Sequence, residues 1–352
     1  MSEASGMAGQ QSAVSESLSP NQRAWRRFRK NKFASVCGVL LVALLGVILL
    51  WPVLSSPTVA KAMPGFLSAG LHLPNEHSAE QFVPPTEHHW FGTDIHGRDI
   101  FSRVIYGARV SLLVGAVGAC VSLVIGVLWG AAAGYLGGRW DAWLMRAVDV
   151  LYSLPSIIFV IVLITTLHGF VDAFQSADVA EKLPRLHNFL LRLGIALKPL
   201  SAITGDRIKF LGLFVGLGAV SWLTMARIVR GQVLSLRTRQ FVDASRALGA
   251  THAQILFRHI LPNITGIIIV YLMLLVPAII LYESFLSYLG LGIQPPQASL
   301  GSLIADGAAQ INPIRIYWWL LVFPCTVLVS TLLALNFFGD GLRDAFDPRG
   351  DR

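Results

Sequence analysis

The chain has 352 residues, of which 54% are hydrophobic and only 14% are charged, and Lys and Arg outnumber Asp and Glu by 28 to 20. Soluble domains devote about a quarter of their residues to charge, and disordered chains are poor in apolar residues. The composition therefore excludes a disordered chain and argues against a soluble enzyme. The three cysteines, Cys37, Cys120 and Cys325, fall in apolar stretches, which argues against a disulfide framework in an exterior domain.

Six apolar windows without Asp, Glu, Lys or Arg are suited to cross a membrane, which takes about 20 mainly apolar residues. They cover residues 33–60, 110–138, 150–171, 210–226, 260–282 and 316–339. A further charge-free window, 284–305, is interrupted by Gly290, Gly292, Pro295 and Pro296 and is not expected to span. The sequence therefore predicts an all-α, polytopic membrane protein with six transmembrane helices.

The positions of Lys and Arg predict the orientation, because short cytoplasmic segments carry the excess of basic residues. With the N-terminus inside, the inner segments 23–32, 139–149, 227–259 and 340–352 carry 17 Lys and Arg residues in 67 positions, and the outer segments 61–109, 172–209 and 306–315 carry 11 in 97. This density ratio of about two to one predicts that both termini are cytoplasmic.

The segments before the second span are expected to lie inside, within and outside the membrane in turn. Residues 1–32 are predicted to form a disordered, basic cytoplasmic N-terminus, and residues 33–54 the first transmembrane helix. An extracytoplasmic loop is expected over 55–108. It contains the motif Phe91-Gly-Thr-Asp-Ile-His-Gly-Arg-Asp99.

Residues 109–339 are predicted to form a core of five transmembrane helices. The core contains an extracytoplasmic insertion over 170–209 and a cytoplasmic loop over 227–263, and a cytoplasmic tail follows over 340–352. Within the insertion, apolar residues recur every three or four positions, which predicts an amphipathic helix on the lipid surface or on a protein partner.

Two smaller patterns predict contacts within the bundle. Gly126, Gly130 and Gly134 line one face of the second span, where they let another helix backbone approach closely. Arg146 and Asp149 lie three positions apart near the inner end of the third span and are expected to pair on one helix face.

The sequence contains no recognisable catalytic motif. It has no Gly-Lys dipeptide, which the phosphate-binding loop of ATPases requires, so the chain is not expected to hydrolyse ATP. Glu87, His88, His89 and His96 gather in the outer loop, but adjacent histidines point in different directions on any regular element. We therefore expect no metal site and no bound cofactor.

Glu283 follows Pro277 in the fifth predicted span. An acidic residue in hydrocarbon is costly and marks a functional position by default, which makes Glu283 a candidate for the transport pathway. It also lies near the outer end of this span, where a carboxylate can reach interfacial water, so both interpretations stay open.

The arginine-rich inner loop is the most informative stretch of the chain. Residues 241–248 favour a short helix, and Gly249 can end that helix in a left-handed conformation. A second helical stretch follows, and Pro262 opens the next span, where a missing N–H costs little. The pattern predicts a short helix that projects from the membrane on the cytoplasmic side.

This loop resembles the cytoplasmic signature of ABC importer permeases, in which a Glu-Ala-Ala triplet precedes a glycine and then Leu-Pro. Here the corresponding residues are Asp243, Ala244, Ser245, Gly249, Leu261 and Pro262, with Asp and Ser replacing Glu and the second Ala. The outer motif residues Gly92, Thr93, Asp94, Gly97, Arg98 and Asp99 narrow the resemblance to the second, C-type permease of dipeptide, oligopeptide and nickel importers.

The resemblance implies the permease fold of type I ABC importers in an inner membrane. It also implies a second homologous permease, two ABC ATPase subunits that bind ATP-Mg, and an extracytoplasmic substrate-binding protein as partners, together with membrane lipid and without nucleic acid. Peptides are the expected substrate, and nickel or another small solute is the alternative. An ion-gradient-driven secondary transporter is a rival class, for which Glu283 is the one indication.

Overall fold

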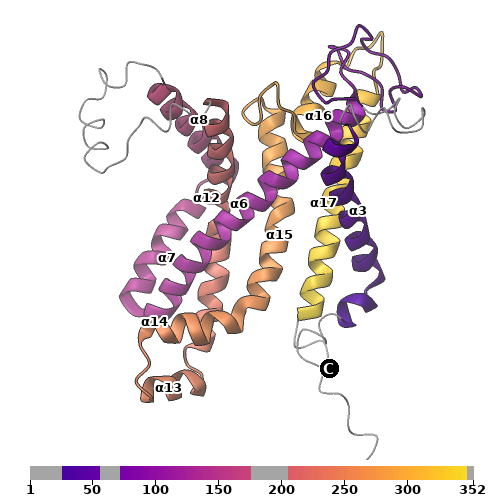
Figure 1. Ribbon diagram of the computed structural model, residues 1–352. Coiled ribbons are helices and arrows are strands. Elements are labelled where there is room, and N and C mark those ends of the chain that lie inside the picture. The colour runs from indigo at the N-terminus through magenta and orange to yellow at the C-terminus, as the bar shows by residue number, and fades with distance from the viewer. Residues whose placement is uncertain (1–25, 56–71, 176–204, 347–352) are drawn as a thin grey trace, which may run out of the picture.

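The computed structural model describes residues 26–55, 72–175 and 205–346, which form a bundle of helices with an irregular cap at one end (Figure 1). Within these ranges there is no β-strand, and an isolated bridge joins Thr93 to Asp99 in the cap. The all-α prediction is confirmed.

Six long segments follow one another through the bundle. They are α3 (Lys32–Leu54), α6 (Ile100–Leu136), the pair α7 (Gly138–Tyr152) and α8 (Ser156–Gln175), α12 (Gly205–Leu236), α15 (Leu261–Tyr288) and α17 (Trp319–Phe346). The helices α3, α6 and α17, and α15 together with the turn before it, are each long and apolar enough to cross a membrane, and α7 with α8 makes a fifth span if the bent pair counts as one. The fourth predicted span, residues 210–226, lies in α12, which is not among the helices of the described residues that meet this criterion; counted with the other five, it makes the arrangement fit the six-helix prediction.

Several helices reach beyond their predicted limits. α6 begins at Ile100, inside the predicted outer loop 55–108, because the Asp99 carboxylate accepts the Ser102 N–H at 2.8 Å and caps the first turn. α12 continues to Leu236 and α17 to Phe346, past the predicted membrane edges. The loops at both ends are correspondingly shorter than the sequence suggested.

The described end of the N-terminal segment is ordered, whereas residues 1–32 were expected to be disordered. Residues 26–30 are helical, and Phe28 is buried with its ring 5.4 Å from that of Phe338 on α17. The amphipathic helix predicted within the insertion lies outside the described residues.

The third predicted span is not a straight helix. The chain breaks just before Pro155, and α7 and α8 meet at 90°, because proline cannot donate a helical hydrogen bond and disfavours helix at the preceding residue. Residues 139–149 were predicted as an inner loop but lie in α7, whose Asp149 pairs with Arg227 of α12 at 2.8 Å rather than with Arg146.

α6 crosses the bundle diagonally, and α12 packs along it through the predicted glycine face (Figure 1). A Cβ atom on Gly126 would lie 2.6 Å from the Cβ of Met225, and one on Gly134 would lie 2.8 Å from the carbonyl oxygen of Arg230. Gly130 approaches the Ala226 carbonyl more closely still. The prediction of close backbone packing is confirmed.

The two ends of the bundle carry different structures. The cap, defined here as residues 72–99, lies beside α16 (Leu300–Ala309), and α13 (Gln240–Ala247) projects from the opposite end (Figure 1). Phe82 stacks on Tyr317 at 4.2 Å and Phe91 on Phe323 at 4.0 Å, so aromatic rings fix the cap to the beginning of α17 and the residues just before it.

Candidate functional site

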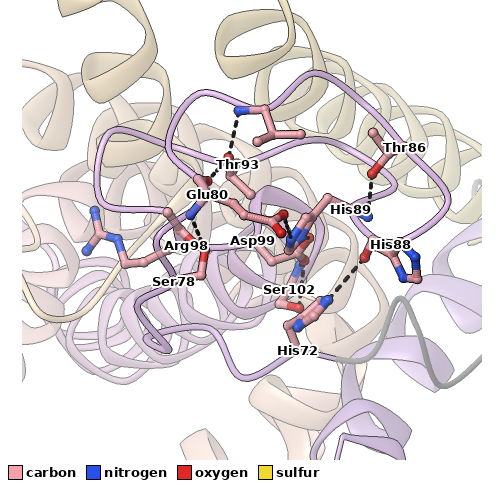
Figure 2. Close-up of polar contacts among 12 residues, drawn as sticks. His72, Ser78, Glu80, Thr86, His88, His89, Thr93, Arg98, Asp99 and Ser102 are labelled. Carbon is pink, nitrogen blue, oxygen red and sulfur yellow. Dashed lines mark hydrogen bonds and ion pairs between the residues drawn. The ribbon is translucent and has the colours of Figure 1, made fainter.

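The predicted outer motif folds into a buried part of the cap (Figure 2). The Thr93 hydroxyl donates to the Glu80 carbonyl at 2.6 Å and accepts the Val83 N–H at 2.9 Å. Gly92 lies so close to the Trp319 indole that a Cβ atom would come within 2.9 Å of it. These contacts join two stretches of the cap to the start of α17.

Asp94 is the centre of the charged groups in the cap. Its carboxylate accepts hydrogen bonds from Arg98 Nε at 2.7 Å, from Arg103 Nη1 at 2.5 Å and from the backbone N–H of His96 at 2.8 Å. Burial alone would raise the pKa of Asp94, but the Arg98 N–H and the guanidinium groups of Arg103 and Arg98 hold that pKa below its usual value. Arg103 also faces Asp306 at 3.7 Å, a partner that spacing along the chain does not reveal.

Gly97 and Asp99 complete the outer motif. Gly97 has a φ of +69°, and a Cβ atom there would collide with the Ser78 carbonyl, so only glycine fits this turn. The Ser78 hydroxyl donates to the Gly97 carbonyl at 2.7 Å. Asp99 caps α6 through Ser102 and lies 3.1 Å from His89 Nδ1. All six predicted motif residues therefore lie together in the cap.

The residues predicted to couple to the ATPase lie at the opposite end of the bundle. Asp243, Ala244 and Ser245 are on α13, where Asp243 makes an exposed ion pair with Arg246 at 3.1 Å. Val242, on the other face of α13, is fully buried in an apolar cluster that includes residues of η2. α13 is therefore anchored on one face and exposed on the other.

A short turn connects α13 to a continuous helical segment that leads into α15. Gly249 follows α13 with a φ of +81°, the left-handed conformation predicted for it. Thr251 and Gln254 form a capping box at α14 (His252–Gln254), and the π-helical turn η2 (Ile255–Ile260) leads directly into α15. Leu261 and Pro262 are the first two residues of α15, where proline needs no helical hydrogen bond.

Exposed apolar side chains surround α13. The Leu248 side chain is 88% exposed, and Phe257 on η2 is also exposed. An open groove of about 890 Å³ lies between the C-terminal end of α6 and α13, and its lining includes Tyr135, Asp243 and Phe257. Such a surface is typical of a protein contact site.

Glu283 is fully buried between helices. Its carboxylate accepts hydrogen bonds from the hydroxyls of Ser287 at 2.7 Å, Ser111 at 2.9 Å and Ser284 at 3.4 Å. The Ser111 hydroxyl also accepts the Leu300 N–H at 3.3 Å, which links α6, α15 and α16. The serine hydroxyls satisfy the carboxylate oxygens, as a polar group inside a membrane requires.

A cavity of about 330 Å³ lies between α12, α15 and the bend before α8. Its polar lining consists of Tyr152, Ser156, Ser221, Thr224, Tyr271 and Tyr282, and apolar side chains complete the wall. None of these lining residues is charged, and Glu283 is not among them. The cavity therefore offers neutral hydroxyl groups within an apolar surface.

Two family descriptions match this chain. Residues 126–352 match the binding-protein-dependent transport system inner membrane component family. Residues 19–69 match the N-terminal transmembrane domain of oligopeptide transport permease C. Together the two matches include α13, the cavity between α12 and α15, and α3.

Curated relatives match over nearly the whole chain. The dipeptide transport system permease protein DppC of Bacillus subtilis is 39% identical over 333 residues, which covers 95% of this chain and 87% of the relative. The oligopeptide transport system permease protein OppC of Escherichia coli is 40% identical over 328 residues, covering 93% of this chain and 91% of the relative. The OppC protein of Haemophilus influenzae is 39% identical over 329 residues, with 93% and 88% covered.

Proposed function

The chain belongs to the family of binding-protein-dependent transport system inner membrane components, and we propose that it is a permease subunit of an ATP-driven importer of dipeptides and oligopeptides. Its relatives DppC and OppC are named as permease proteins of dipeptide and oligopeptide transport systems. In this proposal, a second homologous permease forms the other half of the path, and two ATPase subunits hydrolyse ATP. An extracytoplasmic binding protein delivers the peptide.

The shape of the inner end is the observation that carries this proposal. α13 projects from the bundle with Leu248 exposed, while buried Val242 fixes the helix to the start of α15. A partner that moved α13 would also move α15, because α13 packs against η2, and η2 continues into α15 without an intervening loop. We infer that α13 docks on an ATPase subunit, with Asp243, Ala244 and Ser245 on the docking helix.

The central cavity supports a peptide as the transported solute. A peptide carries amide groups at every residue and side chains of any kind, so a path for many peptides must accept the backbone and discriminate little among side chains. The hydroxyls of Tyr152, Tyr271 and Tyr282 can hydrogen-bond amides, and the absence of charge among the described lining residues avoids selection by side-chain charge.

We propose that the cap is the docking surface for the binding protein, on the assumption that both termini are cytoplasmic. It then faces outward, and the motif from Gly92 to Asp99 fixes its shape. A rigid outer surface lets a loaded binding protein dock without first ordering the permease, which lowers the entropic cost of association.

The contact at α13 can be tested with matched exposed leucine and isoleucine variants of the whole importer. Leu248→Asp should reduce co-purification of the ATPase subunits and ATP-dependent uptake of a labelled dipeptide and tetrapeptide in proteoliposomes. Ile314→Asp changes a 90% exposed side chain in the loop between α16 and α17 and should leave ATPase co-purification intact. Normal co-purification and uptake with Leu248→Asp would contradict the docking proposal.

The same uptake assay separates the alternatives in substrate and energy source. Uptake of nickel without uptake of either peptide would favour the small-solute alternative. Uptake driven by an ion gradient without internal ATP would favour a secondary transporter. Peptide uptake that needs internal ATP and the binding protein supports the proposed function.

A further inference from the structure

A cluster of nitrogen and oxygen donors lies in the cap (Figure 2), and its residues line neither the groove beside α13 nor the cavity between α12 and α15. One donor atom from each of His72, His89 and Asp99 lies within 4.8 Å of the other two. The His89 Nδ1 and Asp99 Oδ1 atoms are 3.1 Å apart, and these two side chains are almost fully buried. The three residues come from separate turns of the cap, so the folded chain brings them together.

We propose that His72, His89 and Asp99 bind a divalent transition-metal ion, with Zn²⁺ as the representative case. Imidazole nitrogen and carboxylate oxygen are standard zinc donors, and three protein ligands leave one position for water. The set contains no thiolate and too few oxygens for a Ca²⁺ or Mg²⁺ site, so the donor chemistry favours zinc, nickel, cobalt or copper.

The second nitrogen of each imidazole already has an acceptor, as is usual for a metal-ligating histidine. His72 Nε2 lies 3.0 Å from the His88 carbonyl oxygen, and His89 Nε2 lies 3.4 Å from Glu80 Oε2. Protons on these two nitrogens would leave Nδ1 of each ring with a lone pair for the ion. The carbonyl and the Glu80 carboxylate would then set the tautomer of both rings.

The distances require a small closing movement. Donor atoms around a tetrahedral zinc with bonds of about 2.0–2.1 Å are separated by about 3.3 Å. The His89–Asp99 pair is already close to this separation at 3.1 Å. His72 stacks on His89 with ring centroids 4.6 Å apart, so its half-buried side chain would move by up to about 1.5 Å to replace stacking with coordination.

Metal binding would connect the beginning of the cap to α6. Asp99 caps the first turn of α6 through the Ser102 N–H and hydroxyl, both at 2.8 Å. An ion held by Asp99, His89 and His72 would therefore tie both stretches of the cap to this helix end. Since an ion that binds only the folded cap stabilises it, Zn²⁺ should raise the thermal stability of the protein.

Equilibrium dialysis of Zn²⁺ against the purified full chain in nanodiscs tests this proposal without reference to transport. The wild-type chain should bind a single Zn²⁺. His72→Phe should weaken this binding at least about tenfold, because loss of a residue that only hydrogen-bonds to a metal ligand already lowers metal affinity by about tenfold or more. Phe retains a ring that can stack on His89 but has no donor atom. His72→Cys, which supplies a thiolate, should restore binding.

A second histidine pair in the same cap provides the matched control. The His77 and His96 rings lie 6.0 Å apart, and His77→Phe should leave the high-affinity site and its stabilisation by Zn²⁺ unchanged. Absorption of the Co²⁺-substituted protein should show tetrahedral coordination in the wild type and in His77→Phe. Equal Zn²⁺ affinity of the wild type and His72→Phe, with both folded by thermal unfolding, would overturn the proposal.

Discussion

The cap and the α13 surface are built in opposite ways. In the cap, Thr93, Asp94 and Asp99 are buried, and each has hydrogen-bond partners within the chain. At the α13 end, Asp243 lines an open groove, and Leu248 is exposed just after the helix. The comparison teaches that these buried polar groups of the cap find their partners within the chain, whereas the α13 end presents apolar surface that a partner would have to bury.

The strongest test of the cap removes its central carboxylate. Asp94→Ala should destabilise the protein by about 3–5 kcal/mol, because it leaves the buried Arg103 without its main counter-charge. The unfolding of the purified protein in detergent measures this loss. Asp306→Asn is the matched control: its side chain is 60% exposed and 3.7 Å from Arg103, so a loss below about 1 kcal/mol is expected. Equal losses would show that Arg103 does not depend on Asp94.

Two glycines with left-handed backbone conformations, one in the cap and one after α13, allow a direct comparison of the two ends of the bundle. Gly97 in the cap has a φ of +69° and Gly249 after α13 has a φ of +81°, so alanine is strained at both by about 1–2 kcal/mol. A Cβ at Gly97 would also collide with Ser78, whereas nothing lies within 4 Å of a Cβ at Gly249. Gly97→Ala should therefore cost about 1–3 kcal/mol more than Gly249→Ala in the same unfolding measurement. Similar losses would mean that the cap yields as readily as the exposed turn.

The smallest expected effect is the acid response of the cap. The pKa of Asp94 is lowered in the folded protein, so its ionised form contributes stability above the usual value of 3.8, and this stability is lost as the pH falls through the lowered pKa. Hydrogen exchange in the cap should accelerate as the pH falls below this usual value, after correction for intrinsic exchange. This acceleration should be absent from Asp94→Ala.

Local patterns were enough to predict much of the bundle. Charge-free windows located the helices, because lipid requires about 20 apolar residues in each span. The glycines at 126, 130 and 134 predicted the contact with α12, since their spacing of four places them on one helix face. The turn at Gly249 also follows the predicted geometry.

Local sequence patterns could not predict contacts between residues that lie far apart in the chain. Arg227, which holds Asp149 of α7, lies 78 positions further along the chain, so the sequence suggested the nearer Arg146. The approach of His72 to Asp99 depends on how an irregular cap returns to α6, for which no periodicity exists. The start of α6 could have been found, because Asp99 followed by Ser102 is a helix-capping pattern.

The glycine contact between α6 and α12 has a mechanical consequence. No side-chain layer separates the two backbones along Gly126, Gly130 and Gly134, so the helices have nothing to repack and would tilt as one lever. With 37 residues, α6 is about 55 Å long, and a tilt of about 10° around its middle would displace each end by roughly 5 Å. A small rotation of α6 at one membrane surface would therefore move its opposite end by about the size of an amino-acid side chain.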